Sequence, residues 1–317
     1  MIDSISIVIP SYNESANINE ICKRTLNVIK QNNISKYEIV FVENGSKDNS
    51  LELLKKINTQ NKSIKIISLS RNFGYQSAIA AGLKHCQNDY VCIMDGDLQD
   101  PPEIISKFIE KIEEGYDVVY GIRIKRKANF IKKIFYNLFY EIYSKLSEID
   151  VPKKAGDFCL MNKKIVKNLN SLNEKNLFMR GLRSWVGFKQ IGIEYNREDR
   201  FAGKTNFSFF SASILAMDGF VSFSLLPLRF ILVTGIIISL LSFFFFLFLF
   251  SVKIFHVFGI INFTSLVMPK GLTLTNSMLT LSLGLVMFTL GIIGEYVGRI
   301  YFEVKNRPNY IINETIL

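Results

Sequence analysis

The sequence predicts an α/β protein with a mainly parallel sheet, followed by two helices that span a membrane. Over the first 120 residues, short β-rich runs alternate with helical stretches. Polar loops rich in Asn, Gly and acidic residues follow those runs, and two long apolar stretches lie toward the C-terminus. Alternation of this kind is typical of parallel sheets covered by helices on both faces, which bind ligands beyond the carboxyl ends of their strands.

The strands and helices of the predicted sheet follow one another in order along the chain. Runs of β-branched and aromatic residues predict the strands, and apolar residues at helical spacing predict the helices. Pro101 and Pro102 end the fourth strand and suit the first turn of the next helix. The predicted strands are residues 5–10, 38–43, 64–70, 90–94 and 117–120, and the predicted helices are residues 17–30, 49–57, 75–86 and 103–114.

Two apolar stretches, residues 231–252 and 272–294, are each long enough to cross a bilayer. A buried core helix is the other interpretation, but the hydrophobic content of 49% is high for a purely soluble protein. The segment between the stretches carries only two lysines, Lys253 and Lys270, whereas arginines and lysines flank the outer ends. Because cytoplasmic loops carry the excess of positive charge, both termini are predicted to be cytoplasmic.

Two further segments have the pattern of helices that lie on a membrane surface. Residues 123–146 place six basic residues before a group of aromatic ones, and residues 207–226 lead into the first apolar stretch. A solvated helix that packs its aromatic side chains on the globular domain is the alternative for the first segment. The predicted organisation is a cytoplasmic domain over 1–206, an interfacial helix over 207–228, two spans with a short extracytoplasmic loop over 229–298, and a cytoplasmic tail over 299–317.

Charge and composition narrow the class of partner. The formal net charge of +10 favours anionic partners, and in a membrane protein these are lipid surfaces and phosphates rather than nucleic acid. The four cysteines have no metal-ligand spacing, which suits reduced thiols. With only two histidines, a zinc site or a His-based triad is not expected.

Asp95 and Asp97 are the most informative pair of residues in the chain. They stand one residue apart where the predicted strand over 90–94 gives way to a loop. Alternate residues of an extended chain point the same way, so the two carboxylates can converge on one hard divalent cation, Mg²⁺ or Mn²⁺. A solvated acidic turn is the competing interpretation, and the other loops of the sheet decide between the two.

Those loops, taken together, resemble polyprenyl-phosphate glycosyltransferases, the membrane-anchored branch of glycosyltransferase family 2 that includes bactoprenol glucosyltransferase and dolichyl-phosphate mannose synthase. The matching pieces occur in the family's order over nearly the whole chain. They are Val8-Ile9-Pro10-Ser11-Tyr12-Asn13-Glu14, Glu43-Asn44-Gly45-Ser46-Lys47-Asp48, Ser70-Arg71-Asn72-Phe73-Gly74, Asp95-Gly96-Asp97-Leu98-Gln99-Asp100-Pro101-Pro102, Gly156-Asp157-Phe158, Arg197 to Phe207, and Gly294-Glu295-Tyr296-Val297-Gly298-Arg299.

The resemblance implies a GT-A fold, which is Rossmann-like, and an inverting transfer of one sugar from a nucleotide diphosphate to a polyprenyl phosphate. It also implies the roles of individual residues. The implied metal ligands are Asp95, Asp97 and Gln99; the nucleotide-sugar residues are Pro10, Tyr12, Glu14, Glu43, Arg71 and Asp95; the acceptor-phosphate residues are Arg123, Arg126, Arg197 and Arg200; and the catalytic residues are Asp157, Asp97 and Arg200.

This sequence departs from the family pattern at two positions. Glu43-Asn44 stands where Asp-Asp is usual, which leaves recognition of the base and ribose open, and Asn206 stands where a lysine is common. The role of Asp157 also has two interpretations. It acts either as the catalytic base on the acceptor side or as a group that orients sugar hydroxyls or a nearby arginine.

The sequence leaves the substrate and the assembly open. Glucose from UDP-glucose is the default donor, with GDP-mannose, UDP-N-acetylhexosamine and a modified UDP-arabinose as alternatives, because one hydroxyl configuration leaves no readable motif. The resemblance suggests undecaprenyl phosphate as acceptor, a homotetramer, and a place in the inner membrane. A processive polysaccharide synthase would need more spans, and a scaffold of the same fold without chemistry is the alternative from another class.

Overall fold

The computed structural model describes residues 2–124, 155–172, 174–175, 177–198 and 272–317, with a few positions between 231 and 251. The chain divides into two compact units. The first comprises Met1–Phe223 together with Asn306–Leu317, and the second comprises Ser224–Lys305.

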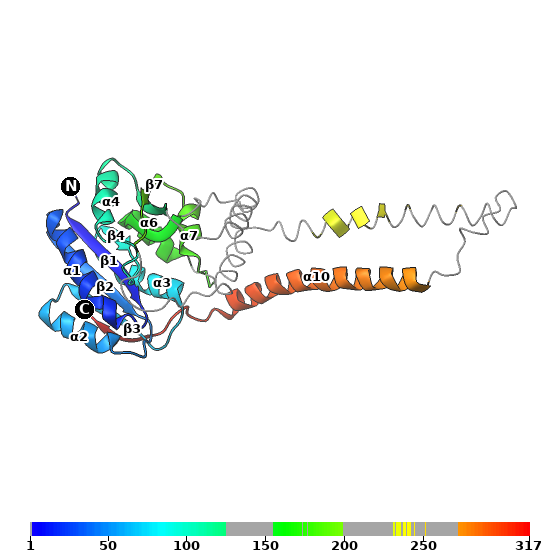
Figure 1. The fold of residues 1–317 in the computed structure, drawn as a ribbon, viewed down its shortest axis with the longest axis horizontal. Coiled ribbons are helices and arrows are strands. Elements are labelled where there is room, and N and C mark those ends of the chain that lie inside the picture. Colours follow the sequence, from blue (N-terminus) through cyan, green and yellow to red (C-terminus); the bar gives the residue numbers. More distant parts are fainter. Residues whose placement is uncertain are drawn as a thin grey trace. The chain divides into compact units, whose positions relative to one another are not determined.

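The first unit is built on one eight-stranded sheet of order β7-β5-β6-β4-β1-β2-β3-β8 (Figure 1). Strands β1, β2, β3 and β4 are mutually parallel and β7 is parallel to β5, whereas β6 and β8 run antiparallel to their neighbours. The sheet is therefore mixed: four neighbouring strands, β4-β1-β2-β3, are parallel, with β8 antiparallel at one end and β6 antiparallel at the other. The strands are β1 (Ser4–Ser11), β2 (Lys36–Glu43), β3 (Ile64–Leu69), β4 (Tyr90–Ile93), β5 (Val118–Arg123), β6 (Ala155–Asn162), β7 (Gln190–Tyr195) and β8 (Ile312–Ile316).

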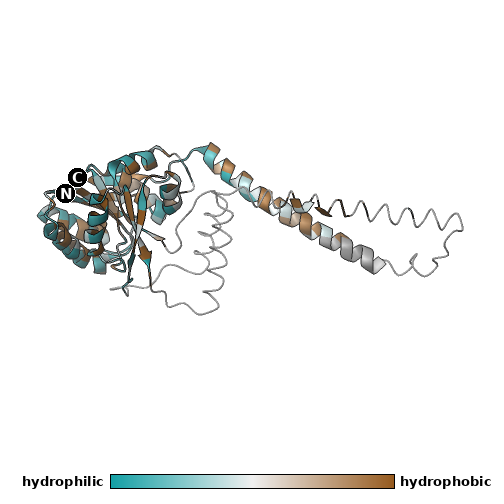
Figure 2. Cartoon of the chain, turned by 90° about the horizontal axis from the view of Figure 1, so that it is seen from above, coloured by the Kyte–Doolittle hydropathy of each residue, from teal (hydrophilic) through white to brown (hydrophobic). Residues whose placement is uncertain are grey.

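Helices cover both faces of this sheet because the strands are apolar on both faces. Every residue of β1 is buried, and successive residues such as Ile7 and Val8 point to opposite faces and belong to different core clusters. Figure 2 shows the hydrophobic strands inside and the more hydrophilic helices around them. The first cluster includes residues of α1 (Ser15–Gln31), α2 (Ser50–Gln60) and α4 (Ile104–Glu113), and the second includes residues of α3 (Tyr75–His85), α6 (Lys163–Ser171) and α7 (Met179–Trp185).

The predicted alternation of strands and helices in the first 120 residues is confirmed. All five predicted strands and all four predicted helices are present, with ends that differ from the predicted ones by at most three residues. The sequence did not predict β6, β7, α6 or α7. Strand β6 pairs with both β4 and β5. It begins at Ala155, which is 62 residues after the end of β4 at Ile93 and 32 residues after the end of β5 at Arg123. Local periodicity carries no signal for such pairing.

The C-terminal residues were expected to form a simple cytoplasmic tail over 299–317. In the structure the last helix, α10, extends to Lys305, and the chain then returns to the sheet as β8, antiparallel to β3. The backbone N–H of Ser70 donates to the carbonyl of Ile311 (2.9 Å), and Lys55 pairs with Glu314 (2.5 Å). The end of the chain therefore belongs to the first unit, beside the loop that follows β3.

The second unit contains α10 (Leu272–Lys305), a helix of 34 residues. Its segment Ser282–Lys305 is long and apolar enough to span a membrane, and none of it is buried within the protein. The predicted second span, 272–294, lies inside this helix. The predicted first span and the two predicted interfacial segments fall mostly or wholly outside the described residues, so one apolar helix is established here rather than two.

Candidate functional site

The loop after β4 carries three carboxylates, Asp95, Asp97 and Asp100, that each lie within 4.0 Å of the side chain of Arg197. Gly96 packs against the backbone of β1, where an added Cβ would lie 3.0 Å from the Pro10 carbonyl oxygen. Leu98 takes a left-handed backbone conformation (φ 59°) and buries its side chain almost completely, which anchors the turn. The turn brings Asp95, Asp97 and Asp100 to the carboxyl edge of the sheet, where ligands of parallel sheets bind.

Asp100 is the most buried of these carboxylates and stands at the centre of a charged network. Its side chain is fully buried and accepts hydrogen bonds from Arg123 Nη2 (2.9 Å) and from the hydroxyl of Tyr195. Arg197 Nε lies 3.6 Å from the same carboxylate. A buried carboxylate needs such partners, because removing a charge from water costs several kcal/mol. The sequence pointed to Asp95 and Asp97 and missed Asp100 and Tyr195.

Asp95 and Asp97 converge on a single cationic group. Arg197 Nη2 lies 3.8 Å from Asp95 Oδ2 and 4.0 Å from Asp97 Oδ2, and Arg123 Nη2 lies 3.3 Å from Asp95 Oδ2. The two carboxylates supply the hard oxygen donors that Mg²⁺ and Mn²⁺ prefer. The residues present therefore fit Mg²⁺ or Mn²⁺.

The protein would supply only a few of the ligands of such a metal site. Within the part of the chain that the structure describes, no group of three His, Cys, Asp or Glu side chains is arranged to hold a metal ion. Gln99, the third implied ligand, contacts Asp97 through its backbone N–H, which donates to Oδ1 (3.1 Å). Mg²⁺ in nucleotide sites is commonly held by one or two carboxylates together with substrate phosphates. Asp95 and Asp97 match this arrangement.

The environment of Asp95 raises the pKa of its carboxyl to about 7. Burial is the largest cause, and the carboxylates of Asp100 and Asp97 add to it, whereas Arg123 and a hydrogen bond from Tyr75 oppose it. The hydroxyl of Tyr75 donates this bond to Asp95 Oδ1. Asp95 thus carries a crowded negative charge that a further cation would stabilise.

Arg123 is held in the network by glycines on the neighbouring strands. Its guanidinium lies against Gly156, where a Cβ would come within 3.2 Å of Nη2. Gly121 leaves room for the ring of Tyr195, whose Cε1 would lie 2.5 Å from an added Cβ, and the Tyr195 hydroxyl accepts from Arg123 Nε (3.2 Å). Burial alone would lower the pKa of Arg123, but Asp100, Tyr195 and Asp95 raise it above its ordinary value.

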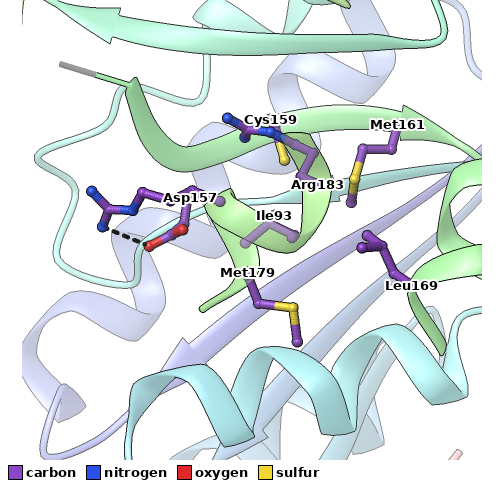
Figure 3. A pocket seen from close by; sticks show the side chains of 8 residues that line it. Ile93, Asp157, Cys159, Met161, Leu169, Met179 and Arg183 are labelled. Atoms are coloured by element: carbon purple, nitrogen blue, oxygen red, sulfur yellow. Dashed lines mark hydrogen bonds and ion pairs between the residues drawn. The ribbon is translucent and has the colours of Figure 1, made fainter. Parts of the chain in front are cut away.

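Asp157 on β6 forms a second acidic position, separate from the loop after β4. Its Oδ2 accepts hydrogen bonds from Gln76 Nε2 (3.3 Å) and Arg180 Nη2 (3.2 Å). Asp157 and Arg183 border a cavity of about 10 Å³, room for about one water (Figure 3). The cavity is otherwise lined by Ile93, Cys159, Met161, Leu169, Met179 and Arg180.

The loop after β2 carries Glu43-Asn44, where the family that the sequence resembles usually has Asp-Asp. Glu43 is buried, and its two oxygens accept hydrogen bonds from the Ser46 N–H and from Ser68 Oγ (3.0 Å). The buried Asn44 amide accepts from the Phe73 N–H (3.0 Å) and donates to the Gly74 carbonyl (3.2 Å). An aspartate at position 44 could not donate, so the neutral side chain is what ties the β2 loop to the β3 loop.

The remaining nucleotide-side residues lie on the same interlocked loops. Pro10 is buried at the end of β1, and Tyr12 is half-buried just beyond it. The side chain of Glu14 accepts from Asn17 Nδ2 at the start of α1. Arg71 donates to the Asn72 carbonyl (3.1 Å) and stacks over the ring of Phe73, with its guanidinium carbon 4.1 Å from the ring centroid.

The structure thus brings Asp95, Asp97, Arg123 and Arg197 into one network, with Asp157 reached through neighbouring residues of α3. Arg126 and Arg200 lie outside the described residues. Residues that the sequence did not assign to the site are Asp100, Tyr195, Tyr75, Gln76 and Arg180. Asp100 lies within the motif that runs from Asp95 to Pro102, and this was the one sequence signal that could have assigned it to the site. No local sequence pattern assigns the other four residues to the site.

The sheet is of the α/β class whose ligands bind beyond the carboxyl ends of the strands, which is where these carboxylates and arginines gather. Residues 6–169 match the model of the family described as glycosyl transferase family 2. The chain is 42% identical, over 98% of its length and 93% of the relative, to an uncharacterised glycosyltransferase of Bacillus subtilis (strain 168), YkcC. It is 36% identical to the SfII prophage-derived bactoprenol glucosyl transferase of Shigella flexneri, over 98% of both chains. The chain belongs to glycosyltransferase family 2.

The fold is similar to that of solved structures such as glucosyl-3-phosphoglycerate synthase from Mycobacterium tuberculosis in complex with Mn²⁺, UDP and phosphoglyceric acid. The TM-score is 0.46 at 13% identity, over 68% of this chain and 75% of that one. The resemblance that the sequence motifs predicted is confirmed by the family match and the full-length relatives. The protein is a glycosyltransferase with a GT-A-like α/β domain.

Proposed function

We propose that the protein is a metal-dependent, inverting glycosyltransferase that transfers one sugar from a nucleotide diphosphate to a polyprenyl phosphate at the cytoplasmic membrane face. Glucose from UDP-glucose is the default donor, and undecaprenyl phosphate is the default acceptor. The observation that carries the proposal is the convergence of Asp95 and Asp97 on one cationic group at the carboxyl edge of the sheet. Full-length relatives named bactoprenol glucosyl transferase support the choice of sugar and lipid.

On the donor side, Asp95 and Asp97 would hold the cation, with Gln99 beside them. A bound Mg²⁺ or Mn²⁺ would neutralise the charge that builds up on the departing nucleoside diphosphate. Pro10, Tyr12, Glu14, Glu43 and Arg71 would form the nucleotide pocket. In that pocket Glu43 would act by holding the loop after β2 in place, because its two oxygens accept hydrogen bonds from Ser46 and Ser68.

On the acceptor side, the nucleophile is a phosphate oxygen that is already anionic, so it needs guiding cations more than a strong base. Arg123 and Arg197 stand beside the carboxylates. When a cation takes the carboxylate oxygens, these guanidinium groups become available to phosphate, which arginine binds well. Arg126 and Arg200 are proposed for the same phosphate, with Arg200 and Asp97 acting in catalysis.

Asp157 is proposed as the catalytic base or as the group that orients the sugar hydroxyls. Its carboxylate is buried, and one of its two oxygens is already held by Gln76 and Arg180. Within the described residues the other oxygen, Oδ1, has no hydrogen-bond partner. A buried acceptor without a donor costs about 1–3 kcal/mol, which is tolerated where a substrate supplies the donor.

The membrane anchor is proposed to consist of two spans, 231–252 and 272–294, with both termini cytoplasmic and the segment 207–228 lying at the interface. The apolar helix α10 is the observation that supports an anchor. An anchor of this kind keeps the catalytic domain beside a lipid acceptor. Glycines at positions 284, 291 and 294 would allow close helix packing in a homotetramer.

A donor panel tests the function. Purified full-length protein is incubated with Mg²⁺ or Mn²⁺ and UDP-glucose, GDP-mannose, UDP-N-acetylhexosamines or a modified UDP-arabinose, with and without undecaprenyl phosphate. The lipid product is identified by mass spectrometry. We expect nucleotide release with one donor only when the lipid is present. No lipid-dependent release with any donor would favour the scaffold of the same fold.

Asp97→Ala is the matching variant, and Asp3→Ala at the amino end of β1 is its control. Loss of the metal carboxylate should lower turnover about a thousandfold, the equivalent of roughly 4 kcal/mol, while the protein stays folded. The exposed Asp3 side chain lies at the opposite edge of the sheet, and its loss should leave turnover unchanged. Retained turnover in Asp97→Ala would place the metal elsewhere.

A further inference from the structure

Two consecutive residues at the start of α3 each contact one of the acidic positions. The hydroxyl of Tyr75 donates to Asp95, and the side-chain amide of Gln76 donates to Asp157 Oδ2 (3.3 Å). The first turn of α3 therefore spans the distance between the loop after β4 and strand β6. The Tyr75 contact belongs to the metal position described above, whereas the Gln76 contact has a separate consequence.

The orientation of the Gln76 amide is set by the protein backbone. Its carbonyl oxygen accepts a hydrogen bond from the N–H of Met179 (2.8 Å), the first residue of α7. A backbone N–H can only donate, so the oxygen of Gln76 must face α7 and its NH₂ group must face Asp157. Figure 3 shows Met179 and Asp157 at the border of the same cavity.

The Gln76 amide and Arg180 together fix which oxygen of Asp157 is free. Both donate to Oδ2, whereas Oδ1 is buried and has no hydrogen-bond partner among the described residues. Asp157 as a whole is only 7% exposed, so water does not freely solvate that oxygen. A carboxylate that is held by one oxygen has its other oxygen fixed in direction as well.

We propose that Gln76 is a positioning residue, which holds Asp157 by Oδ2 and thereby fixes the direction in which Oδ1 points. The catalytic consequence rests on the proposed function, in which Asp157 acts on the sugar or the acceptor. The two hydrogen bonds that join Met179 to Gln76 and Gln76 to Asp157, called the clamp below, do not depend on that function. The two can therefore be tested separately, one by stability and the other by turnover.

Gln76→Glu is the informative variant, because it keeps the size of the side chain and replaces the donor NH₂ with a carboxylate oxygen. One oxygen of the introduced carboxylate would keep the bond from Met179, and the other would face Asp157 Oδ2. Two carboxylates in contact cannot both ionise cheaply, so the pair should retain a proton to higher pH. The charged and titratable groups around the pair are Arg180 and Arg183 from α7, Tyr75 from α3, Arg123 from β5, and Cys159 on β6.

The reciprocal exchange Gln76→Glu/Asp157→Asn restores an acid–amide pair with the partners reversed. The carboxylate at position 76 then accepts from the amide at position 157 and from the Met179 N–H, and Arg180 still has a carboxylate nearby. The exchange therefore removes the repulsion without restoring the carboxylate at position 157. Gln87→Glu is the control for added charge, since Gln87 is exposed beside the opposite, amino edge of the sheet.

The experiment measures thermal unfolding of the full-length protein in detergent at pH 5 and pH 8. Gln76→Glu should lose more stability than Gln87→Glu at pH 8, with a smaller difference at pH 5, and the double variant should recover the lost midpoint at pH 8. Equal unfolding of Gln76→Glu and Gln87→Glu at both pH values would overturn the clamp. A double variant no more stable than Gln76→Glu would overturn it as well.

Turnover separates the clamp from the catalytic role. In Gln76→Glu the acid limb of kcat/KM should move up by about one pH unit or more, with the KM for the donor nearly unchanged. Gln76→Met, which removes both polar contacts, should lower kcat about tenfold. The double variant should be stable yet inactive. If it regains turnover, Asp157 is not a catalytic group, while the clamp itself stands on the unfolding data.

Discussion

The two halves of the sheet contribute to the same site in different ways. In the half made by β1, β2 and β3, no buried ion pair joins the loops among the described residues: Asn44 joins the Phe73–Gly74 backbone, Ser46 accepts from the Asn13 N–H (3.0 Å), and the carboxylate of Glu43 accepts from Ser46 and Ser68. In the half made by β4, β5, β6 and β7, oppositely charged side chains bind one another, as the largely buried Arg123 of β5 does with the fully buried Asp100 after β4. The loops of the first half hold one another in place, and the second half supplies the arginines, Arg123 and Arg197, that lie beside the carboxylates.

The two halves differ in how much free energy it costs to bury their polar groups. Polar loops that satisfy one another lose little on folding, because each donor meets an acceptor of ordinary strength. A buried carboxylate such as Asp100 is stable only while Arg123, Tyr195 and Arg197 remain in place. We therefore expect substitutions in the second half to lower stability more than equivalent substitutions in the first.

The largest expected effect is that of Asp100→Ala. Removing the carboxylate leaves Arg123 buried without its closest partner and Tyr195 without its acceptor, which should cost about 3–5 kcal/mol. Chemical unfolding of the full-length protein measures this, with Asp89→Ala as a control, because the Asp89 side chain is 70% exposed. A loss below about 1 kcal/mol would mean that the buried network contributes little to stability.

Glycine substitutions compare the two halves directly. Gly45→Ala meets both a left-handed backbone (φ 68°) and the Arg71 carbonyl carbon at 2.5 Å, whereas Gly121→Ala meets only the Tyr195 ring at 2.5 Å. Overpacking of this size costs about 1–3 kcal/mol, and the left-handed conformation adds roughly 1 kcal/mol. Gly115→Ala isolates the conformational cost, because its φ is 91° and an added Cβ meets nothing within 4 Å.

The readout for these glycines is nucleotide binding by calorimetry together with unfolding. Gly45→Ala should weaken binding of the nucleoside diphosphate, because the β2 and β3 loops must separate. Gly121→Ala should mainly lower stability and turnover through Tyr195 and Arg123. Equal losses of nucleotide affinity in the two variants would show that the halves do not divide the work in this way.

The pKa of Asp95 predicts how metal binding depends on pH. Since burial and the neighbouring carboxylates raise that pKa to about 7, the folded, metal-free protein holds a proton that the unfolded chain releases near the ordinary value of 3.8. The stability from this proton is fully present below about pH 4 and is lost as the pH rises through 7. A cation must displace the proton, so Mn²⁺ affinity should rise about tenfold between pH 6 and pH 8, with most of the rise below pH 7.

Titration with Mn²⁺ by calorimetry at these pH values measures the effect. Asp95→Asn removes the group that titrates, so its weaker metal binding should vary little over the same range. An affinity in the wild-type protein that is constant between pH 6 and pH 8 would contradict the assignment of Asp95 as a ligand.

The smallest expected effect is that of Arg24→Ala, which removes a contact between the two halves. Arg24 on α1 pairs with Glu103 (2.6 Å) and with Glu198 (3.2 Å), and the N–H of Glu198 donates to the Gln99 carbonyl (3.0 Å). Both glutamates are about half exposed, so the pairs should contribute less than about 1 kcal/mol to stability. A salt titration of the unfolding midpoint checks this, since exposed pairs weaken as ionic strength rises.

The part of the site that could be predicted lies where local sequence carries the signal. Asp95 and Asp97 follow a buried apolar run directly, and that run pairs with β1 in a parallel ladder of similar local pattern. Asp157 was reached through a motif resemblance alone, because β6 is antiparallel and its partners are distant in the chain. Gln76 and Tyr195 could not have been assigned, since an amide on a helix and a tyrosine on a strand are ordinary until their neighbours are known.

The sequence by itself determined the order of strands and helices, the apolar helix at the C-terminus and the acidic pair after β4. These depend on side-chain periodicity and on residues a few positions apart, which the chain carries locally. Only the tertiary structure decided which charges meet and which oxygen of Asp157 is held. Those contacts join Tyr195 to Asp100 and Asp157 to Gln76 across 95 and 81 residues. Their energy depends on burial, and burial exists only after the halves have packed.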